Sequence, residues 1–303
     1  MKPTGNSTAQ SLGSPLRSDV AAFGSVQVTL DKFPALRQRP GPGVGQSLPN
    51  NFLKHVDEQT VAALAAVLQA IEQFGLAETR FSDWGVVAAP AFLGRATLVV
   101  ALQRHGDEGA WGVSPHFIPH RSQHAVAGTI SQALKIHGPN FGTGGGPQGA
   151  AEALLAGAVL LEGNQLPGIW IALAGWEPEQ IPDLEGKPIT DSVCRAVAFA
   201  LVPPKQGSQG IRLHITTANR EELNGSANGS GHDSRPTLEV VQEALSGAGK
   251  SPRKLVWSLN RSTIIELKLG LPDEQVEEPA MGHGPVGRVR EFGQAGAGTE
   301  KKR

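Results

Sequence analysis

The sequence predicts an α/β fold built in layers, because buried strands alternate with helices along most of the chain. A continuous apolar run at 169–174 and a largely apolar run at 194–202 are typical of strands that are covered on both faces. Apolar residues also recur at helical spacing from about Asp57 to Phe74, and Gly75 follows them as a C-terminal cap. These observations together favour a sheet with packed helices.

The same patterns predict the other elements. Further helices are expected over 92–104, 126–136, 150–161 and 236–248. Further strands are expected over 26–30, 84–90, 211–215 and 255–259, with the third of these pairing beside 194–202. Composition then divides the chain into a disordered lead (1–24), a main domain (25–217), a polar linker (218–235), a short helix-and-strand segment (236–270) and a disordered tail (271–303).

Charge and composition exclude several classes of protein. The chain has 303 residues and a formal net charge of −1, which gives no electrostatic reason to expect nucleic acid as a partner. No apolar run approaches the roughly 20 residues that span a bilayer, and no basic then apolar leader opens the sequence. The single cysteine, Cys194, excludes an internal disulfide framework. We therefore expect a cytoplasmic protein.

The most site-like stretch is a glycine-rich turn that precedes the predicted helix 150–161. Its residues, called the glycine turn below, are Gly144, Gly145, Gly146, Pro147, Gln148 and Gly149. Backbone N–H groups at the start of a helix bind anions, and α/β folds often expose a nucleophile there. This turn contains no Ser, Cys, Thr or Lys, so it has the architecture of an active site without a reactive atom.

Other motifs carry weaker signals. The spacing Gly144-x-Gly146-x-x-Gly149 matches a dinucleotide fingerprint with Glu177 as the ribose ligand, but three adjacent glycines satisfy that pattern easily. His116, His120 and His124 recur every four residues, yet nearby prolines and the lack of neighbouring acidic ligands favour a polar loop over a metal site. Cys194 opens an apolar strand and is interpreted as a small core residue.

Several segments resemble the β-ketoacyl synthase family of the thiolase fold. They are Ser-Pro-His-Phe-Ile-Pro at 114–119, Gln-His-Ala-Val-Ala-Gly at 123–128 and Leu-Lys-Ile-His-Gly-Pro-Asn at 134–140. In that family a similar stretch leads into the nucleophile elbow. The resemblance covers about residues 50–217 and, more loosely, 236–265. It implies a thiolase-like layered fold, mainly its N-terminal half, with 236–270 as a remnant of the second half.

The catalytic residues that the family implies are missing from this sequence. The family's catalytic cysteine aligns with Gly146 or Pro147, and its first histidine aligns with Arg261. The second histidine lies in a Gly-His motif, which here occurs only as Gly282-His283 in the tail and is interpreted as coincidence. Without a thiolate, the acyl-enzyme intermediate of condensation does not form. We therefore expect no catalytic residues, no metal and no cofactor.

The resemblance implies a silent subunit whose partner is an active β-ketoacyl synthase or a second copy of this chain, with an acyl carrier protein nearby. The alternative is an acyl-thioester or acyl-carrier enzyme of altered chemistry. It would use N–H groups of the glycine turn as oxyanion donors and His124 or His137 as the base. A structural relic without a partner is the third possibility.

Overall fold

The computed structural model describes residues 15–38, 48–49, 51–115, 117–181, 183, 187, 191–205, 210–217, 235–247, 253–259 and 263–270. Within these ranges the strands form one eight-stranded sheet in the order β3-β2-β4-β5-β1-β6-β8-β7. Strand β2 is parallel to β3 and β4, and every other neighbouring pair is antiparallel. The strands are β1 (Leu16–Val28), β2 (Gly85–Pro90), β3 (Asn140–Gly142), β4 (Ile169–Glu177), β5 (Val193–Val202), β6 (Ile211–Thr217), β7 (Arg253–Ser258) and β8 (Thr263–Leu269).

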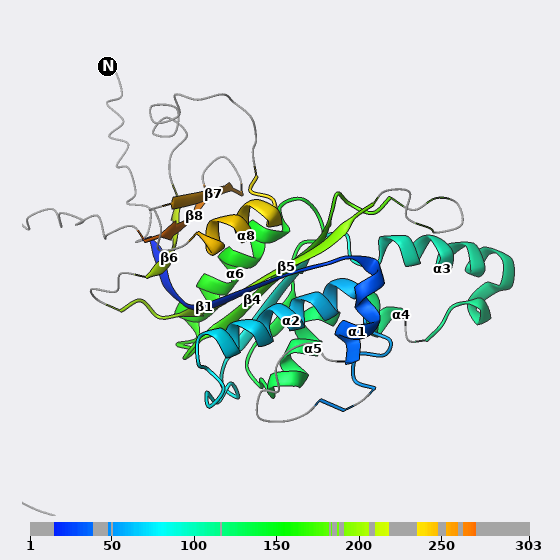
Figure 1. Cartoon of the computed structure of the whole chain (residues 1–303), viewed down its shortest axis with the longest axis horizontal. Coiled ribbons are helices and arrows are strands. Elements are labelled where there is room, and N and C mark those ends of the chain that lie inside the picture. The colour runs from blue at the N-terminus through cyan, green and yellow to red at the C-terminus, as the bar shows by residue number, and fades with distance from the viewer. Residues whose placement is uncertain are drawn as a thin grey trace, which may run out of the picture. The chain divides into compact units, whose positions relative to one another are not determined.

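Helices cover both faces of this sheet (Figure 1). Helices α2 and α5 pack on one face, and α6 and α8 pack on the other. The helices of the described ranges are α1 (Phe33–Gln38), α2 (Glu58–Gln73), α3 (Arg95–Glu108), α4 (Phe117–Arg121), α5 (His124–Leu134), α6 (Gly149–Gly163) and α8 (Leu238–Ser246), with short 3-10 helices η1 (Leu30–Lys32) and η2 (Gly109–Gly112).

The predicted buried strands are confirmed. All six residues of β2 are buried, and along β4 successive side chains enter opposite layers: Trp170 and Ala172 face α2, whereas Ile171 and Leu173 face α6. A strand covered on both faces has no solvent side, which explains why its sequence is apolar at every position rather than at alternate ones. The predicted helices at 57–74, 92–104, 126–136, 150–161 and 236–248 are also present, with ends shifted by a few residues.

The expectation of a disordered lead over 1–24 is wrong from Leu16 onward, where β1 begins. Strand β1 lies between β5 and β6, near the middle of the sheet. The expected strand at 26–30 overlaps only the end of β1, because the earlier part of β1 has no continuous apolar run and contains Gly24. A Cβ atom at Gly24 would lie 2.1 Å from the carbonyl oxygen of Ala66 on α2, so the helix rests directly on the strand.

The expected sheet needs two further corrections, one in the pairing of a strand and one in a strand that was not expected. Strand β6 does not lie beside β5, because β1 separates them and β6 pairs with β1 and β8. Strand β8 was not expected at all, yet its residues Ile265, Leu267 and Leu269 are buried in the core. Through β8 and β7 the segment 236–270 continues the same sheet, within one compact unit that extends from Met1 to Leu271. Most of the linker and the whole tail lie outside the described residues.

A buried arginine on β5 anchors helix α8. Arg195 donates to Gln27 on β1 at 2.6 Å, to Gln242 at 2.9 Å and to Glu239 at 2.6 Å, the last two on α8. Its Nε atom lies 3.2 Å from Glu177, whose carboxylate accepts from the N–H groups of Leu238 and Glu239. The carboxylate of Glu177 therefore caps the start of α8. These contacts weigh against the ribose-ligand role that the dinucleotide pattern offered for Glu177.

We expect Arg195→Met to lower the free energy of unfolding by about 3 kcal/mol, because it leaves partly buried carboxylates without their cation. Urea unfolding measures this loss, and hydrogen exchange should accelerate first in α8. Arg253→Met is the matched control, since Arg253 is exposed and reaches α8 only through a 3.5 Å contact with the Glu243 carbonyl. Its cost should stay within about 0.5 kcal/mol. Equal losses in both variants would contradict the anchoring role.

Candidate functional site: the glycine turn

The glycine turn joins β3 to α6 at the carboxyl ends of β2 and β3. The N–H of Thr143 donates to the carbonyl of Ala88 at 2.8 Å, and the N–H of Phe92 donates to the carbonyl of Gly145 at 3.1 Å. The turn is thus held against the segment that follows β2. The carboxyl ends of parallel strands are where open α/β sheets place their ligand sites.

Two of the turn glycines are required by the backbone. Gly144 and Gly145 have φ angles of +70° and +115°, which L-residues rarely adopt. A Cβ atom at Gly144 would lie 2.5 Å from the Cα of Gly149, and one at Gly145 would lie 2.7 Å from Nε2 of Gln123. A side chain at either position would therefore strain the turn.

Gly146 differs from its neighbours because a Cβ atom there meets nothing within 4 Å. Its φ angle is also outside the range that only glycine favours. From the resemblance, the family's catalytic cysteine is expected at Gly146 or at Pro147, and Pro147 is exposed. Space for a nucleophilic side chain is therefore kept at Gly146, while the side chain itself is absent.

The charge around the turn is unfavourable for an oxyanion. Glu152 lies in the first turn of α6, and its Oε2 atom would be 3.0 Å from a Cβ atom at Gly144. A carboxylate here satisfies the helix dipole from within the chain. The N-cap residue Gln148 makes no side-chain capping bond, and the N–H of Gly149 donates within the turn to Gly146. These features weigh against the alternative that the turn stabilises a developing negative charge.

Two buried polar atoms lie beside the turn without a hydrogen-bond partner in the described part of the chain. They are Oε1 of Gln123 and Oγ1 of Thr143. Gln123 contacts the turn directly, since its amide nitrogen lies against Gly145. Buried acceptors without partners cost free energy, so these two atoms mark a place where a polar group of a ligand would be stabilised.

The two histidines considered as bases lie in different surroundings. The N–H of His137 donates to the carbonyl of Ser82, before β2 begins. Thr143, directly before the glycine turn, instead donates to Ala88 near the other end of β2. His137 and the glycine turn therefore lie towards opposite ends of β2, which weighs against His137 as the base. His124 opens α5 close to Gly142, and its side chain is exposed beside Gly128. His124 remains the base that the alternative would use.

The predicted polar loop at 116–124 is wrong in part, because it forms the short helix α4 and the start of α5. Pro119 is accommodated in the first turn of α4, where its missing N–H has no helical partner. His120 and His124 lie in separate helices, and His116 lies outside the described residues. In the ranges that the structure describes, no three His, Cys, Asp or Glu residues are grouped to hold a metal ion.

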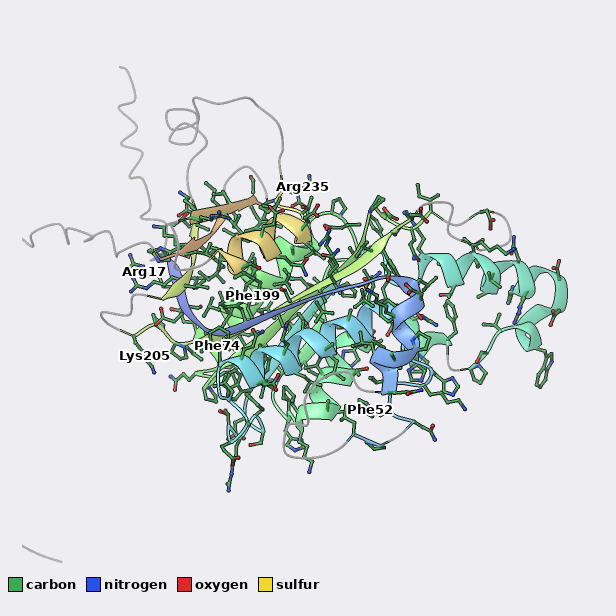
Figure 2. All side chains as sticks on the ribbon, viewed as in Figure 1. Arg17, Phe52, Phe74, Phe199, Lys205 and Arg235 are labelled. Atoms are coloured by element: carbon green, nitrogen blue, oxygen red, sulfur yellow. The ribbon has the colours of Figure 1, made fainter. Side chains whose placement is uncertain are left out.

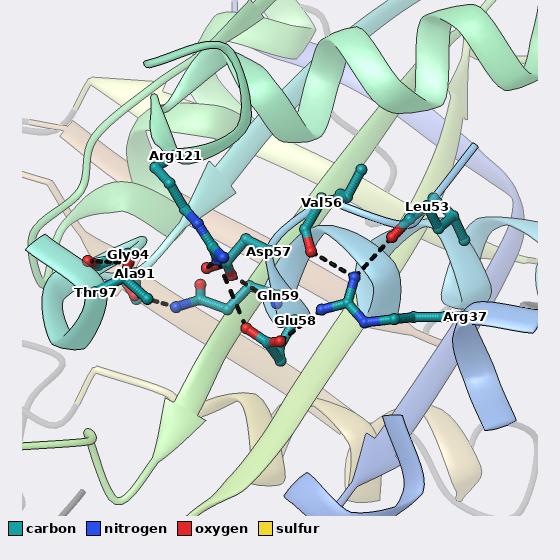
Figure 3. A network of polar contacts seen from close by, with 10 residues as sticks. All are labelled: Arg37, Leu53, Val56, Asp57, Glu58, Gln59, Ala91, Gly94, Thr97 and Arg121. Carbon is teal, nitrogen blue, oxygen red and sulfur yellow. Dashed lines mark hydrogen bonds and ion pairs between the residues drawn. The ribbon is translucent and has the colours of Figure 1, made fainter. Parts of the chain in front are cut away.

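Sequence reasoning missed a polar network at the start of α2, which contacts the segment after β2 (Figure 3). Arg121 at the end of α4 pairs with Asp57, the N-cap of α2, and lies 3.7 Å from Glu58. Gln59 donates to the carbonyl of Ala91 at 2.9 Å, next to the residue that contacts Gly145. Burial, followed by the charge of Glu58, raises the pKa of Asp57, while Arg121 and the N–H of Gln59 lower it.

Cys194 is a core residue, as expected. Its side chain is fully buried, and burial followed by the charges of Asp57 and Glu58 raises the pKa of its thiol well above the usual value. Because only the thiolate reacts, we expect no labelling of the native protein by a disulfide exchange reagent and one equivalent after unfolding in urea. Rapid labelling of the native protein would contradict this assignment.

The remaining sequence candidates lie outside the described residues. Arg261 falls in the connection between β7 and β8, whose flanking residues are joined by a 3.1 Å bond from the N–H of Leu259 to the carbonyl of Thr263. Gly282 and His283 belong to the tail. In the described ranges, no helix has the length and apolar character that crossing a bilayer requires.

Comparisons with known proteins bear on the fold. Residues 39–144 match the model of the β-ketoacyl synthase N-terminal domain. The AntDE:AntF structure, a type II polyketide acyl-carrier protein in complex with its ketosynthase, includes a chain that is 12% identical, with a TM-score of 0.53 over 84% of this chain and 99% of that chain. A comparison with curated proteins gives no match.

Two other solved structures pair a ketosynthase with a chain length factor. The ApeO and ApeC complex from Xenorhabdus doucetiae matches at 11% identity and TM-score 0.52, covering 84% of this chain and 99% of that one. The ishigamide ketosynthase/chain length factor matches at 12% identity and TM-score 0.52, covering 86% and 99%. These findings confirm the resemblance to the β-ketoacyl synthase family, and the fold is the thiolase-like layered α/β fold.

Proposed function

We propose that this chain is a catalytically silent β-ketoacyl synthase-like subunit that pairs with an active ketosynthase in fatty-acid or polyketide-type biosynthesis. The observation that carries the proposal is the glycine turn, which keeps space for a nucleophile at Gly146 and presents none. Decarboxylative condensation needs a thiolate to hold the acyl chain, so this turn does not perform the covalent step. The active cysteine must then come from a partner.

The structures that resemble this chain support a pairing role. Two of them are assemblies of a ketosynthase with a chain length factor, and one includes an acyl-carrier protein. In each case the similarity extends over 99% of the matched chain and 84 to 86% of this chain. The likeness therefore concerns the whole matched chain and not one part of it. An acyl carrier protein is accordingly proposed as a further partner of the complex.

An apolar surface on α3 and η2 is the proposed pairing surface. Its exposed residues are Leu98 (43% exposed), Leu102 (63%) and Trp111 (99%). Within the described ranges α3 has no buried side chain and packs mainly on η2, away from the sheet (Figure 1). Exposed apolar groups gathered on one segment are typical of interaction sites. Strand β3, at one edge of the sheet, offers a second element that another chain could pair with.

Co-purification with the co-encoded ketosynthase tests the proposal. The tagged chain should recover a synthase with an intact catalytic cysteine, and light scattering should give the mass of a complex of the two chains. Recovery of this chain only, as a monomer or a homodimer, would contradict the proposed pairing. Attention would then move to ligand binding at the glycine turn.

A second candidate function, an acyl-thioester enzyme of altered chemistry, is favoured by the unpartnered Gln123 and Thr143 oxygens beside the turn. It predicts saturable thioester turnover by the isolated chain and loss of that turnover in Gln148→Ala or His124→Ala. The carboxylate of Glu152 against Gly144 opposes it, because transition-state stabilisation there requires donors rather than a second negative charge.

A further inference from the structure

A second cavity lies at the opposite end of α6 from the glycine turn. Its volume is about 460 Å³, within the range of ligand pockets, and its walls come from α6, the loop after it, and the ends of β1 and β5. The 15 residues of α6 correspond to about 22 Å of helix. The cavity is therefore separate from the glycine turn, and we call it the α6 pocket.

The walls of the α6 pocket are mainly apolar. Ala158, Leu161 and Leu166 form one side, and their side chains are at most 9% exposed. Three prolines form the other side, namely Pro15, Pro203 and Pro204. Proline has no backbone N–H, so this wall offers a ligand rigid hydrocarbon surface and no donor that needs a partner. An aliphatic chain fits such walls.

Two cations and one carboxylate lie at or directly beside the α6 pocket. Arg17 lies on the rim, and Lys205 follows Pro204 directly; both are exposed and lie at the same end of the molecule (Figure 2). One carboxylate, that of Glu162, also lines the pocket. Asp19, the next acidic group, lies 3.6 Å from Arg212 and accepts from the backbone N–H of Lys205.

The electrostatic surroundings of Arg17 point the same way. His214 on β6 is the cross-strand neighbour of Arg17. Burial lowers the pKa of this histidine, and the charges of Lys268, Arg17 and Arg212 lower it further. The charge of Glu266 acts in the opposite direction. Glu266 is itself paired with Lys254 and lies 3.9 Å from Lys268. Cations therefore outweigh acids at this end of β1, which favours an anionic group beside Arg17.

An unusual backbone conformation places an amide on the lip of the pocket. Gln165 has a φ angle of +50°, at the position after a helix where glycine is common. The helix end is closed by a bond from the N–H of Leu166 to the carbonyl of Leu161 at 3.3 Å. Non-glycine residues in this conformation are strained and concentrate at functional sites. The Gln165 amide can hydrogen-bond a carboxylate, which a glycine at this position could not do.

We propose that the α6 pocket binds an aliphatic carboxylate. Its chain lies between the leucines of α6 and the prolines, and its carboxylate lies beside Arg17 and Gln165. This site is distinct from the glycine turn and goes beyond the proposed pairing function, on which it does not depend. A failure to bind the carboxylate would therefore not bear on the proposed complex with a ketosynthase, and the reverse also holds.

Calorimetric titration with decanoate and with decanol separates the contributions of chain and head group. The full chain should bind decanoate at one saturable site and bind decanol more weakly. Arg17→Met should weaken decanoate binding by at least about tenfold and leave decanol binding unchanged, because only the carboxylate loses a charge-assisted hydrogen bond. Lys32→Met removes an exposed cation on η1 and should change neither titration.

Photo-crosslinking then locates the site. A decanoate carrying a diazirine on its chain should label residues within 158–166 or 203–205, and excess decanoate should prevent this labelling. Absence of saturable decanoate binding would overturn the proposal, as would equal affinities in the wild type and in Arg17→Met. Labelling confined to the glycine turn or to α3 would overturn it too, since the bound chain would then lie elsewhere.

Discussion

Gly146→Cys should produce a folded protein whose new thiol is alkylated by iodoacetamide, although the wild type remains unlabelled under the same conditions. A Cβ atom at this position meets nothing within 4 Å, so the added side chain needs no rearrangement. The only native thiol, Cys194, is fully buried and does not compete for the reagent. Labelling is measured by intact mass before and after brief exposure to the reagent.

The matched variant is Gly145→Cys, one residue earlier in the same turn. Its Cβ atom would lie 2.7 Å from Nε2 of Gln123, on a backbone with φ of +115°. We expect a loss of unfolding free energy of about 1 to 3 kcal/mol in this variant and almost none in Gly146→Cys. Similar losses in both variants would contradict the assignment of Gly146 as the vacant nucleophile position. Neither variant should condense acyl groups alone, since groups that stabilise developing charge are also required.

Trp111→Ser should weaken the complex with the co-encoded ketosynthase by at least about 30-fold, because tryptophan side chains at the centre of interfaces often contribute 2 kcal/mol or more. In the isolated chain Trp111 is 99% exposed, so this substitution should leave the thermal unfolding temperature unchanged. Affinity is measured by surface plasmon resonance with the ketosynthase immobilised.

Val240→Ser provides the control for the interface variant. Val240 is 43% exposed on α8, outside the surface on α3 and η2, and its replacement removes an exposed apolar side chain elsewhere on the chain. The complex should keep its affinity in this variant. If Trp111→Ser bound as tightly as the wild type, the surface on α3 and η2 would not be the pairing surface.

The layered α/β architecture could be predicted from the sequence because its central strands carry a strong signal. Residues 169–174 are apolar without interruption, and 194–202 are apolar except for Arg195, which is typical of strands covered on both faces. The sequence of β1 carries no such signal. Its residue Gly24 is dictated by the carbonyl of Ala66 on α2, a contact between residues far apart in the chain.

The position of the candidate site was predictable, but its geometry was not. The run of glycines marked the turn, and the resemblance left Gly146 and Pro147 as alternatives for the lost cysteine. Only the three-dimensional surroundings show that Gly146 is open while Gly144 and Gly145 are constrained. The pairing of Arg121 with the start of α2 was equally hidden, because its partner Asp57 is 64 residues away in sequence.

The most direct test of a silent pairing subunit is a condensation assay with purified components. We expect no product from this chain alone and product from its complex with the ketosynthase. Replacing the ketosynthase nucleophile should abolish the product, whereas Gln148→Ala in this chain should leave it unchanged. Condensation or acyl-enzyme formation by this chain in the absence of a ketosynthase would contradict the account.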